Sequence, residues 1–274
     1  MTDNTRYYFD GRHYMRLTIE YEECAENPRT FCDNFTHLWL WSKDLYHCYY
    51  IGDDDAPAYN PITCQSYDWQ SALQYLVRYE VTDKKVITYV KSGETHLQLY
   101  YDRHDRNWYL YDGDDGYIDY TDQSVDWLID STIEELTEQE CCEILEKYCN
   151  MVILPIKYVD YGSGYEDIMM CDYDDMTGFI WTDKDLVKAA GWTDNWKDHG
   201  YELCKGDIDV MSLYCQGCVY VVTQEVYNWE TGDFEDYDCY CGYMSDKYGD
   251  DLFEEIAGTY NLYQDFSALY KGVA

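Results

Sequence analysis

The chain has 274 residues, enough for one large domain or two smaller ones, and its 55 Asp and Glu residues against 19 Lys and Arg give a net charge of −36. That charge repels nucleic acid, phosphates and anionic membranes, and it attracts basic partners. The chain shows neither a signal-peptide run nor the ~18 consecutive apolar residues of a membrane-spanning helix, so we expect a cytoplasmic protein whose 13 cysteines are reduced.

The first part of the chain is patterned for strands. Hydrophobic residues alternate over residues 7–9 and 13–21, which predicts one or two β-strands. The apolar run at 36–41 predicts a buried strand. Between these strands an Asn-Pro dipeptide starts a turn, in which we expect Arg29 and Asp33 to pair locally.

Residues 67–80 predict a helix, because their apolar side chains recur at a spacing of three and four residues. Residues 85–101 alternate between apolar and polar and predict a β-hairpin that turns at 91–94. A further strand is predicted at 108–111, before an Asp- and Gly-rich turn at 112–116. The apolar face of the predicted helix holds Trp69, Ala72, Leu73, Leu76 and Val77.

A second helix is predicted from residue 133 to about residue 148. Thr132 and Glu135 have the spacing of a capping box and mark its start. The side chains expected to face inward are Ile133, Leu136, Ile144, Leu145 and Tyr148. Those expected to face solvent are Glu134, Glu135, Glu138 and Glu143.

The rest of the chain alternates between strands and helices. The predicted strands are at 151–160, 218–226 and 237–243, the last two joined by a turn at 230–234. The predicted helices are at 184–190, capped by Thr182 or Asp183, and after residue 251. These elements predict an α+β fold with mixed, mostly antiparallel sheets and four or five short helices, as a single globule over residues 1–274 or two packed subdomains.

Several short motifs occur in an order typical of a known family. Residues 27–36 read Asn-Pro-Arg-x-x-x-Asp-Asn-x-Thr, and an aromatic strand leads from them to Ile-Gly-Asp at 51–53. This resembles the opening signature of an uncharacterised family of acidic proteins from phages, plasmids and other mobile elements. Its members typically show Ser-Pro-Arg, Trp-Asp-Asn, Gly-Thr-Met and Leu-Gly-Asp; here Asn27 replaces the Ser and Cys32 the Trp.

The resemblance continues through the strand at 151–160, the stretch at 171–181, the hairpin turn at 230–234 and Gly-Asp-Asp at 249–251. It covers about residues 20–55 and 142–256, so we interpret residues 56–110 as an insertion. It implies an α+β fold and a mobile-element origin. No established activity comes with it, and therefore no functional residue.

The acidic residues are clustered. Thirteen of them, and no Lys or Arg, lie between Arg106 and Lys147, interleaved with apolar residues that a disordered acidic tail would lack. Carboxylates three or four residues apart on a helix are ~5–6 Å from one another, near the ~7 Å between phosphates of one DNA strand. The predicted partner-binding residues form two rows: Asp112, Asp114, Asp115, Asp119, Asp122, Asp126, Asp130, Glu134, Glu135, Glu138 and Glu143; and Glu230, Asp233, Glu235, Asp236, Asp238, Asp250, Asp251, Glu254 and Glu255.

These rows favour a non-catalytic protein that binds the basic groove of a host defence enzyme, a CRISPR or restriction nuclease, and inhibits it as a DNA mimic. Catalysis is the weaker class, because the six His have no Ser or Cys partner at a recognisable spacing and no Gly-rich phosphate loop is present. A different interpretation is that the charge serves solubility alone.

A metal-binding enzyme or module is the other alternative. Cys215 and Cys218 with Cys239 and Cys241 outline a zinc site, which competes with their interpretation as buried small hydrophobes. The Asp-rich turns at 112–119 and 172–175 lack the spacing of a calcium loop. Paired carboxylates suit Mg²⁺ in a nuclease, but the basic groups that would hold its substrate are scarce. We therefore expect no cofactor, with zinc as the alternative.

Overall fold

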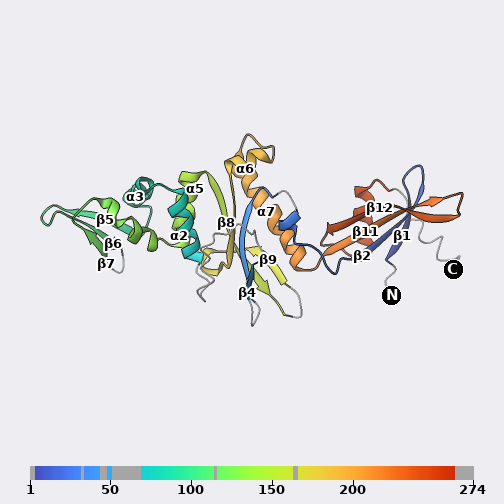
Figure 1. Ribbon diagram of the computed structural model, residues 1–274, viewed down its shortest axis with the longest axis horizontal. Helices are drawn as coiled ribbons and strands as arrows, with labels where there is room; N and C mark the ends of the chain where they lie inside the picture. The colour runs from blue at the N-terminus through green and yellow to red at the C-terminus, as the bar shows by residue number, and fades with distance from the viewer. Residues whose placement is uncertain are drawn as a thin grey trace. The chain divides into compact units, whose positions relative to one another are not determined.

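The computed structural model describes residues 4–31, 34–43, 48–50, 69–113, 116–162 and 166–262 (Figure 1). They form two compact units. Unit 1 is built from the described parts of 1–32, 159–168 and 209–274, and unit 2 from those of 33–158 and 169–208. The predicted α+β class is confirmed, with helices and three sheets whose described strand pairs are antiparallel. No helix in these residues is long and apolar enough to span a membrane.

Unit 1 contains a four-stranded sheet of order β1-β2-β11-β12. Its strands are β1 (Thr5–Phe9), β2 (Tyr14–Tyr21), β11 (Val219–Asn228) and β12 (Asp233–Met244). Strands were expected in these regions, from the alternation at 7–9 and 13–21, from the apolar run at 218–226, and at 237–243 after the predicted turn. The alternation of side chains along a strand puts Leu17 and Val222 on the face covered by helix α8 (Gly249–Thr259), where they pack against Phe253 and Ile256.

The largest sheet has the order β4-β3-β10-β8-β9. Its strands are β3 (His37–Lys43), β4 (Cys48–Tyr50), β8 (Met151–Asp160), β9 (Glu166–Met170) and β10 (Gly178–Asp183). The central strand β10 is buried over its first five residues, as an apolar run without alternation predicts. Gly178 allows β10 to approach β3 closely, because a Cβ at this position would lie 2.3 Å from the carbonyl oxygen of Trp39.

Unit 2 also contains a small sheet of order β5-β6-β7 and several helices. The elements are α2 (Trp69–Glu80), α3 (Asp83–Ser92), β5 (Leu97–Asp102), β6 (Asn107–Asp112), β7 (Gly116–Thr121), the 3₁₀ helix η2 (Val125–Leu128), α4 (Ile129–Glu134) and α5 (Glu138–Cys149). Leu73 and Val77 of α2 share one hydrophobic core with Trp39 and Phe179. The described part of the stretch interpreted as an insertion thus contributes to the main core of unit 2.

The described chain contains eight α-helices rather than four or five. The remaining ones are α1 (Pro28–Phe31), α6 (Lys184–Ala189) and α7 (Trp196–Cys215), with the 3₁₀ helix η3 at Tyr173–Asp175. Helix α6 begins after Asp183, whose carboxylate accepts hydrogen bonds from two backbone N–H groups, as one of the two predicted caps. The long helix α7 was not predicted. It contains Gly200, where a Cβ would lie 3.1 Å from Thr182 Cγ2 and 3.2 Å from Val152 Cγ2.

The predicted hairpin at 85–101 is wrong in its first half, which forms helix α3. The helix starts after Thr82, and it ends at Gly93, whose φ of 75° is a left-handed C-cap conformation. Alternation would have put Val86 and Ile87 on opposite faces of a strand, whereas the helix buries both. Burial in the unit 2 core overrides the strand preference of these β-branched residues.

The predicted capping box at Thr132 and Glu135 is also wrong. Thr132 lies inside α4, where its hydroxyl donates to the Leu128 carbonyl oxygen at 2.6 Å. The same Thr-x-x-Glu spacing recurs at Thr137 and Glu140, and this second pair is the capping box that starts α5. The single predicted helix is therefore two helices separated by the buried Leu136.

Candidate binding surfaces

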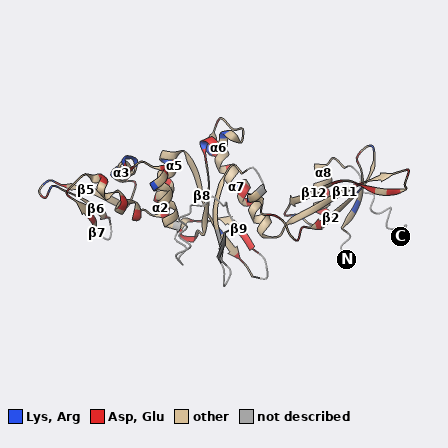
Figure 2. Ribbon diagram, in the orientation of Figure 1, with Lys and Arg blue, Asp and Glu red and all other residues tan. Residues whose placement is uncertain are grey.

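In the ribbon of Figure 2, segments coloured for Asp and Glu occur in both units, and segments coloured for Lys and Arg are few. The first acidic surface is the set of carboxylates within residues 112–146, all in unit 2. The second acidic surface is the set within residues 230–255, all in unit 1. Asp33, which was predicted to pair with Arg29, lies outside the described residues. Asp114 and Asp115 of the first surface lie outside them too.

The exposed part of the first surface runs along η2 and α4. Asp122, Asp126, Asp130 and Glu134 recur every four residues, and each is exposed. Asp122 precedes η2, and the helical spacing that buries Leu128 and Ile133 holds the other three acids on the solvent side. Neighbours four residues apart on a helix, such as Asp130 and Glu134, are ~5–6 Å from one another. The result is a row of carboxylates on an ordered element, with Glu135 exposed beside it.

Cations neutralise little of this row. Asp130 pairs with Arg78, and Asp126 accepts a hydrogen bond from the Ser124 hydroxyl at 2.8 Å. In the described part of the chain, the carboxylates of Asp122, Glu134 and Glu135 have no hydrogen-bond or ion-pair partner. Glu138, in the first turn of α5, is half-buried, as is Asp112 at the end of β6. Asp122, Glu134 and Glu135 are therefore the predicted residues whose carboxylates face solvent without a partner in the described chain.

Glu143 was expected to face solvent freely, and this is wrong. Its Oε2 accepts a hydrogen bond from the Tyr89 hydroxyl at 2.5 Å, and its Oε1 accepts one from Gln139 Nε2 at 2.9 Å. Burial, with the neighbouring Glu143, strongly raises the pKa of Tyr89. Asp119 is also occupied, because it accepts from Ser131 Oγ at 2.5 Å and from the Tyr120 N–H at 2.8 Å. Both carboxylates are half-buried and form hydrogen bonds within unit 2.

Glu140 is a buried carboxylate that joins α5 to the start of β5. Its oxygens accept hydrogen bonds from the backbone N–H groups of His96 and Thr137, at 2.9 and 3.0 Å, and His96 Nδ1 lies 2.8 Å away. Burial favours the protonated form, but the hydrogen bonds from Thr95, Thr137 and His96 outweigh it and hold the pKa of Glu140 below its usual value. This acid stabilises the fold and presents no charge to a partner.

We expect Glu140 to make the stability of the protein acid-sensitive. Its pKa is lowered on folding, so its stabilising contribution is present above about pH 4.5 and is lost as the pH falls through the lowered pKa. Thermal melts at about pH 7 and about pH 3.5 should show a larger fall in melting temperature for wild type than for Glu140→Gln, because glutamine does not titrate. Glu138→Gln, in the same helical turn, is the matched control and should behave as wild type. Equal losses for wild type and Glu140→Gln would contradict this role.

The second acidic surface contains a comparable set of exposed acids. Glu230, Asp236, Asp251 and Glu254 are exposed, and within the described residues none has a hydrogen-bond or ion-pair partner for its carboxylate. Asp236 lies opposite Glu225 in the sheet register, and Arg16 is bound to Glu225 in a bidentate ion pair. Arg16 therefore neutralises Glu225, whereas the adjacent Asp236 is exposed to solvent.

Other acids of the second surface have structural roles. Glu235 accepts hydrogen bonds from Asn228 and Thr231 across the hairpin turn. Asp250 pairs with Arg6 Nη2 at 2.6 Å, and Glu255 pairs with Lys247 Nζ at 2.9 Å. Burial favours protonated Glu255, but hydrogen bonds from Lys247, Tyr243 and Ser245 hold its pKa below the usual value.

Aspartates also block the open edges of the sheets. β12 is an edge strand, and Asp233 and Asp238 each accept a hydrogen bond from the N–H of the following residue, at 2.8 and 2.9 Å. Asp119 does the same on the edge strand β7, and Asp167 on the edge strand β9. An N–H occupied by its own neighbour cannot pair with another strand, so these charges discourage edge-to-edge association.

The four cysteines predicted as zinc ligands do not converge. In the described chain no three His, Cys, Asp or Glu side chains form a group that could hold a metal ion. Cys239 pairs with Thr223, five residues along the chain from Cys218, a separation of ~17 Å for an extended strand. Cys215 is mostly buried at the end of α7, and burial raises its pKa to about 12, which fits the alternative of a small hydrophobe. Cys239 and Cys241 are instead exposed on β12.

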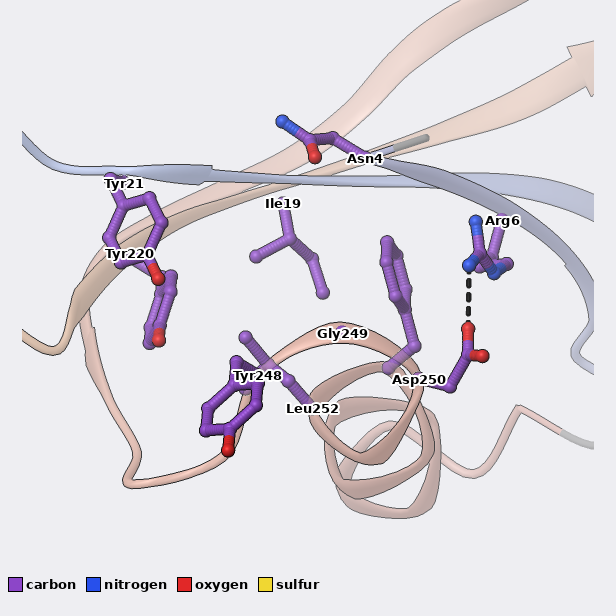
Figure 3. Close-up of a pocket in the computed structure, with 10 residues that line it drawn as sticks. Asn4, Arg6, Ile19, Tyr21, Tyr220, Tyr248, Gly249, Asp250 and Leu252 are labelled. Carbon is purple, nitrogen blue, oxygen red and sulfur yellow. Dashed lines mark hydrogen bonds and ion pairs between the residues drawn. The ribbon is translucent and has the colours of Figure 1, made fainter. Parts of the chain in front are cut away.

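A pocket of about 390 Å³, which no sequence pattern indicated, lies in unit 1 between β1, β2, β11 and the start of α8 (Figure 3). Its lining comes from residues that are far apart in the chain, among them Arg6, Tyr21, Tyr220 and Tyr248. A composition rich in tyrosine was the one available signal, and it does not indicate which tyrosines meet.

No protein-family model matches this chain, and neither a curated protein nor a solved structure matches it. The resemblance to acidic mobile-element proteins therefore depends on the sequence motifs alone. Arguments about function depend on the geometry of the two acidic surfaces and of the unit 1 pocket.

Proposed function

We propose that the protein is a non-catalytic inhibitor of mobile-element origin that binds the basic nucleic-acid groove of a host defence nuclease, of the CRISPR or restriction type. The observation that carries this proposal is the set of exposed carboxylates that have no cationic partner within the described residues. Asp122, Glu134 and Glu135 represent it in unit 2, and Asp236 and Glu254 in unit 1.

The physical basis is electrostatic complementarity. A nuclease groove that binds DNA is lined with Lys and Arg, and the i,i+4 pair Asp130 and Glu134 of α4, at ~5–6 Å, approaches the ~7 Å between phosphates along one strand. Because these carboxylates are already solvated at the surface, a basic partner binds them without opening a core. Association of this kind is fast and depends on salt.

The test is displacement of DNA from nucleases. Fluorescent duplex DNA bound to each of a panel of purified restriction and CRISPR nucleases is titrated with this protein, and anisotropy reports the release of DNA. We expect competitive displacement from at least one nuclease, weakening steeply as salt rises from about 0.05 to 0.5 M. Displacement that is unchanged at about 1 M salt would contradict mimicry.

A second function is favoured by the aspartates on the edge strands. Asp119, Asp167, Asp233 and Asp238 occupy backbone N–H groups of their own strands, which is a device against aggregation. On this alternative the whole charge serves solubility. The protein would then displace DNA from none of the nucleases, and Asp233→Asn with Asp238→Asn would increase its self-association in light scattering.

A further inference from the structure

The pocket in unit 1 has two ends joined by an apolar floor (Figure 3). Ile19 of β2 and Leu252 of α8 lie between the ends, and both are buried. One end holds Arg6 and Asp250, and the other holds Tyr21, Tyr220 and Tyr248.

The first end already binds a cation that belongs to this chain. The guanidinium carbon of Arg6 lies 4.8 Å from the centre of the Phe253 ring, and its Nη2 is 2.6 Å from Asp250 Oδ1. An aromatic face and a carboxylate are the two groups that stabilise a guanidinium at a partly dry site. This end shows which ligand chemistry the walls of the pocket suit.

The second end has the aromatic faces without a cation. The rings of Tyr21 and Tyr220 lie 4.9 Å apart, and the Tyr220 hydroxyl donates to the Lys247 carbonyl oxygen at 3.1 Å, which orients its ring. Tyr21 and Tyr248 are 64% and 75% exposed, so their faces are open to a ligand. Within the described residues no Lys or Arg is stacked on any of the three rings.

We infer that the tyrosine end of this pocket is an anchor site for the guanidinium group of an arginine on the basic partner, an inference that rests on the proposed function. The arginine's planar head would stack on Tyr21 and Tyr248, and its aliphatic stem would lie along Ile19 and Leu252. An anion is disfavoured, because Asp250 and Asp251 occupy the first turn of α8 and oppose the positive end of the helix dipole. A neutral ligand would not use the field of a chain with charge −36.

The test uses the full chain and two short peptides, Gly-Arg-Gly and its uncharged isostere Gly-citrulline-Gly, titrated by NMR at about 0.15 M salt so that distant charges are screened. We expect the arginine peptide to bind about three- to thirtyfold more tightly than the citrulline peptide. Tyr248→Ala and Tyr21→Ala should remove that difference, whereas Tyr248→Phe, which keeps the ring, should retain it.

The matched control is Tyr237→Ala, because Tyr237 is an equally exposed tyrosine on β12 outside the pocket. It should bind both peptides as wild type does, and circular dichroism melts check that all variants fold. Equal affinities for the two peptides, or an equal loss from Tyr237→Ala and Tyr248→Ala, would overturn the inference. The titration contains no nuclease. A negative result would therefore overturn the arginine site alone, whereas the DNA displacement assay tests the proposed function separately.

Discussion

Replacing Asp122, Glu134 and Glu135 with lysine is expected to weaken binding to the nuclease groove by about a hundredfold at low salt. Each reversal exchanges an attraction of about 0.5 kcal/mol, typical of an exposed ion pair, for a repulsion of similar size, so three reversals cost about 3 kcal/mol, and about 1.4 kcal/mol is a factor of ten in affinity. The fold should persist, because these side chains are exposed and have no described partners. The melting temperature should stay similar or rise, since self-repulsion falls and lysines at the end of α4 favour its dipole. Anisotropy competition against labelled DNA measures the affinity.

The matched control reverses three exposed acids outside both acidic surfaces, Asp172, Asp194 and Glu202. Both variants change the net charge from −36 to −30, so the long-range field alters equally and only the location of the charges differs. We expect the loss of binding free energy in the control variant to be less than a third of the loss in the first variant. Equal losses would mean that total charge alone drives binding, without a localised row of carboxylates.

Gly178→Ala is expected to cost at least about 3 kcal/mol in the free energy of unfolding. A Cβ at this position would lie 2.3 Å from the Trp39 carbonyl oxygen and 2.9 Å from the Leu40 Cα, both backbone atoms of β3. Relief requires β3 to move away from β10, which would break the register in which Gly178 pairs with Leu40. The strand is central and buried, so the displacement would also open the unit 2 core. Urea denaturation followed by tryptophan fluorescence measures the loss.

Gly206→Ala in α7 is the control, because a Cβ there meets no atom within 4 Å and the residue is exposed. Alanine loses less backbone entropy than glycine in a helix, so this variant should gain about 0.5–1 kcal/mol. A Gly178→Ala protein as stable as wild type would show that the sheet can widen at this point without cost.

Much of the strand structure could be predicted because a half-buried strand imposes a period of two on its own sequence. Residues 13–21 show that period and form β2, and the apolar run at 218–226 lies in the region that forms β11. Helix α2 was equally predictable from the spacing of Leu73, Leu76 and Val77 on one face. In each case the pattern lies within a single helix or strand, so it can be recognised without knowing what that element packs against.

Local signals failed where two structures satisfied the same pattern. The segment from Val86 to Val90 is rich in β-branched and aromatic residues and alternates, yet it forms a helix because the surrounding core buries Val86, Ile87, Tyr89 and Val90 together. The Thr-x-x-Glu spacing occurs at Thr132 and again at Thr137, and only the packing of Leu136 separates the two helices. Helix α7 went unpredicted because glycines weaken its helical signal.

The sequence by itself determined that the protein is strongly acidic, that its acids lie on folded elements, and that strands alternate with helices, since charge and periodicity are properties of the chain alone. Only the tertiary structure decided that Glu134 has no partner within the described residues, whereas Glu143 and Glu140 are held by Tyr89 and His96, which lie more than forty residues away along the chain. It also brought Tyr21, Tyr220 and Tyr248 into one pocket. Whether a carboxylate is solvated or satisfied depends on donors from other elements, and no local pattern in the sequence encodes those donors.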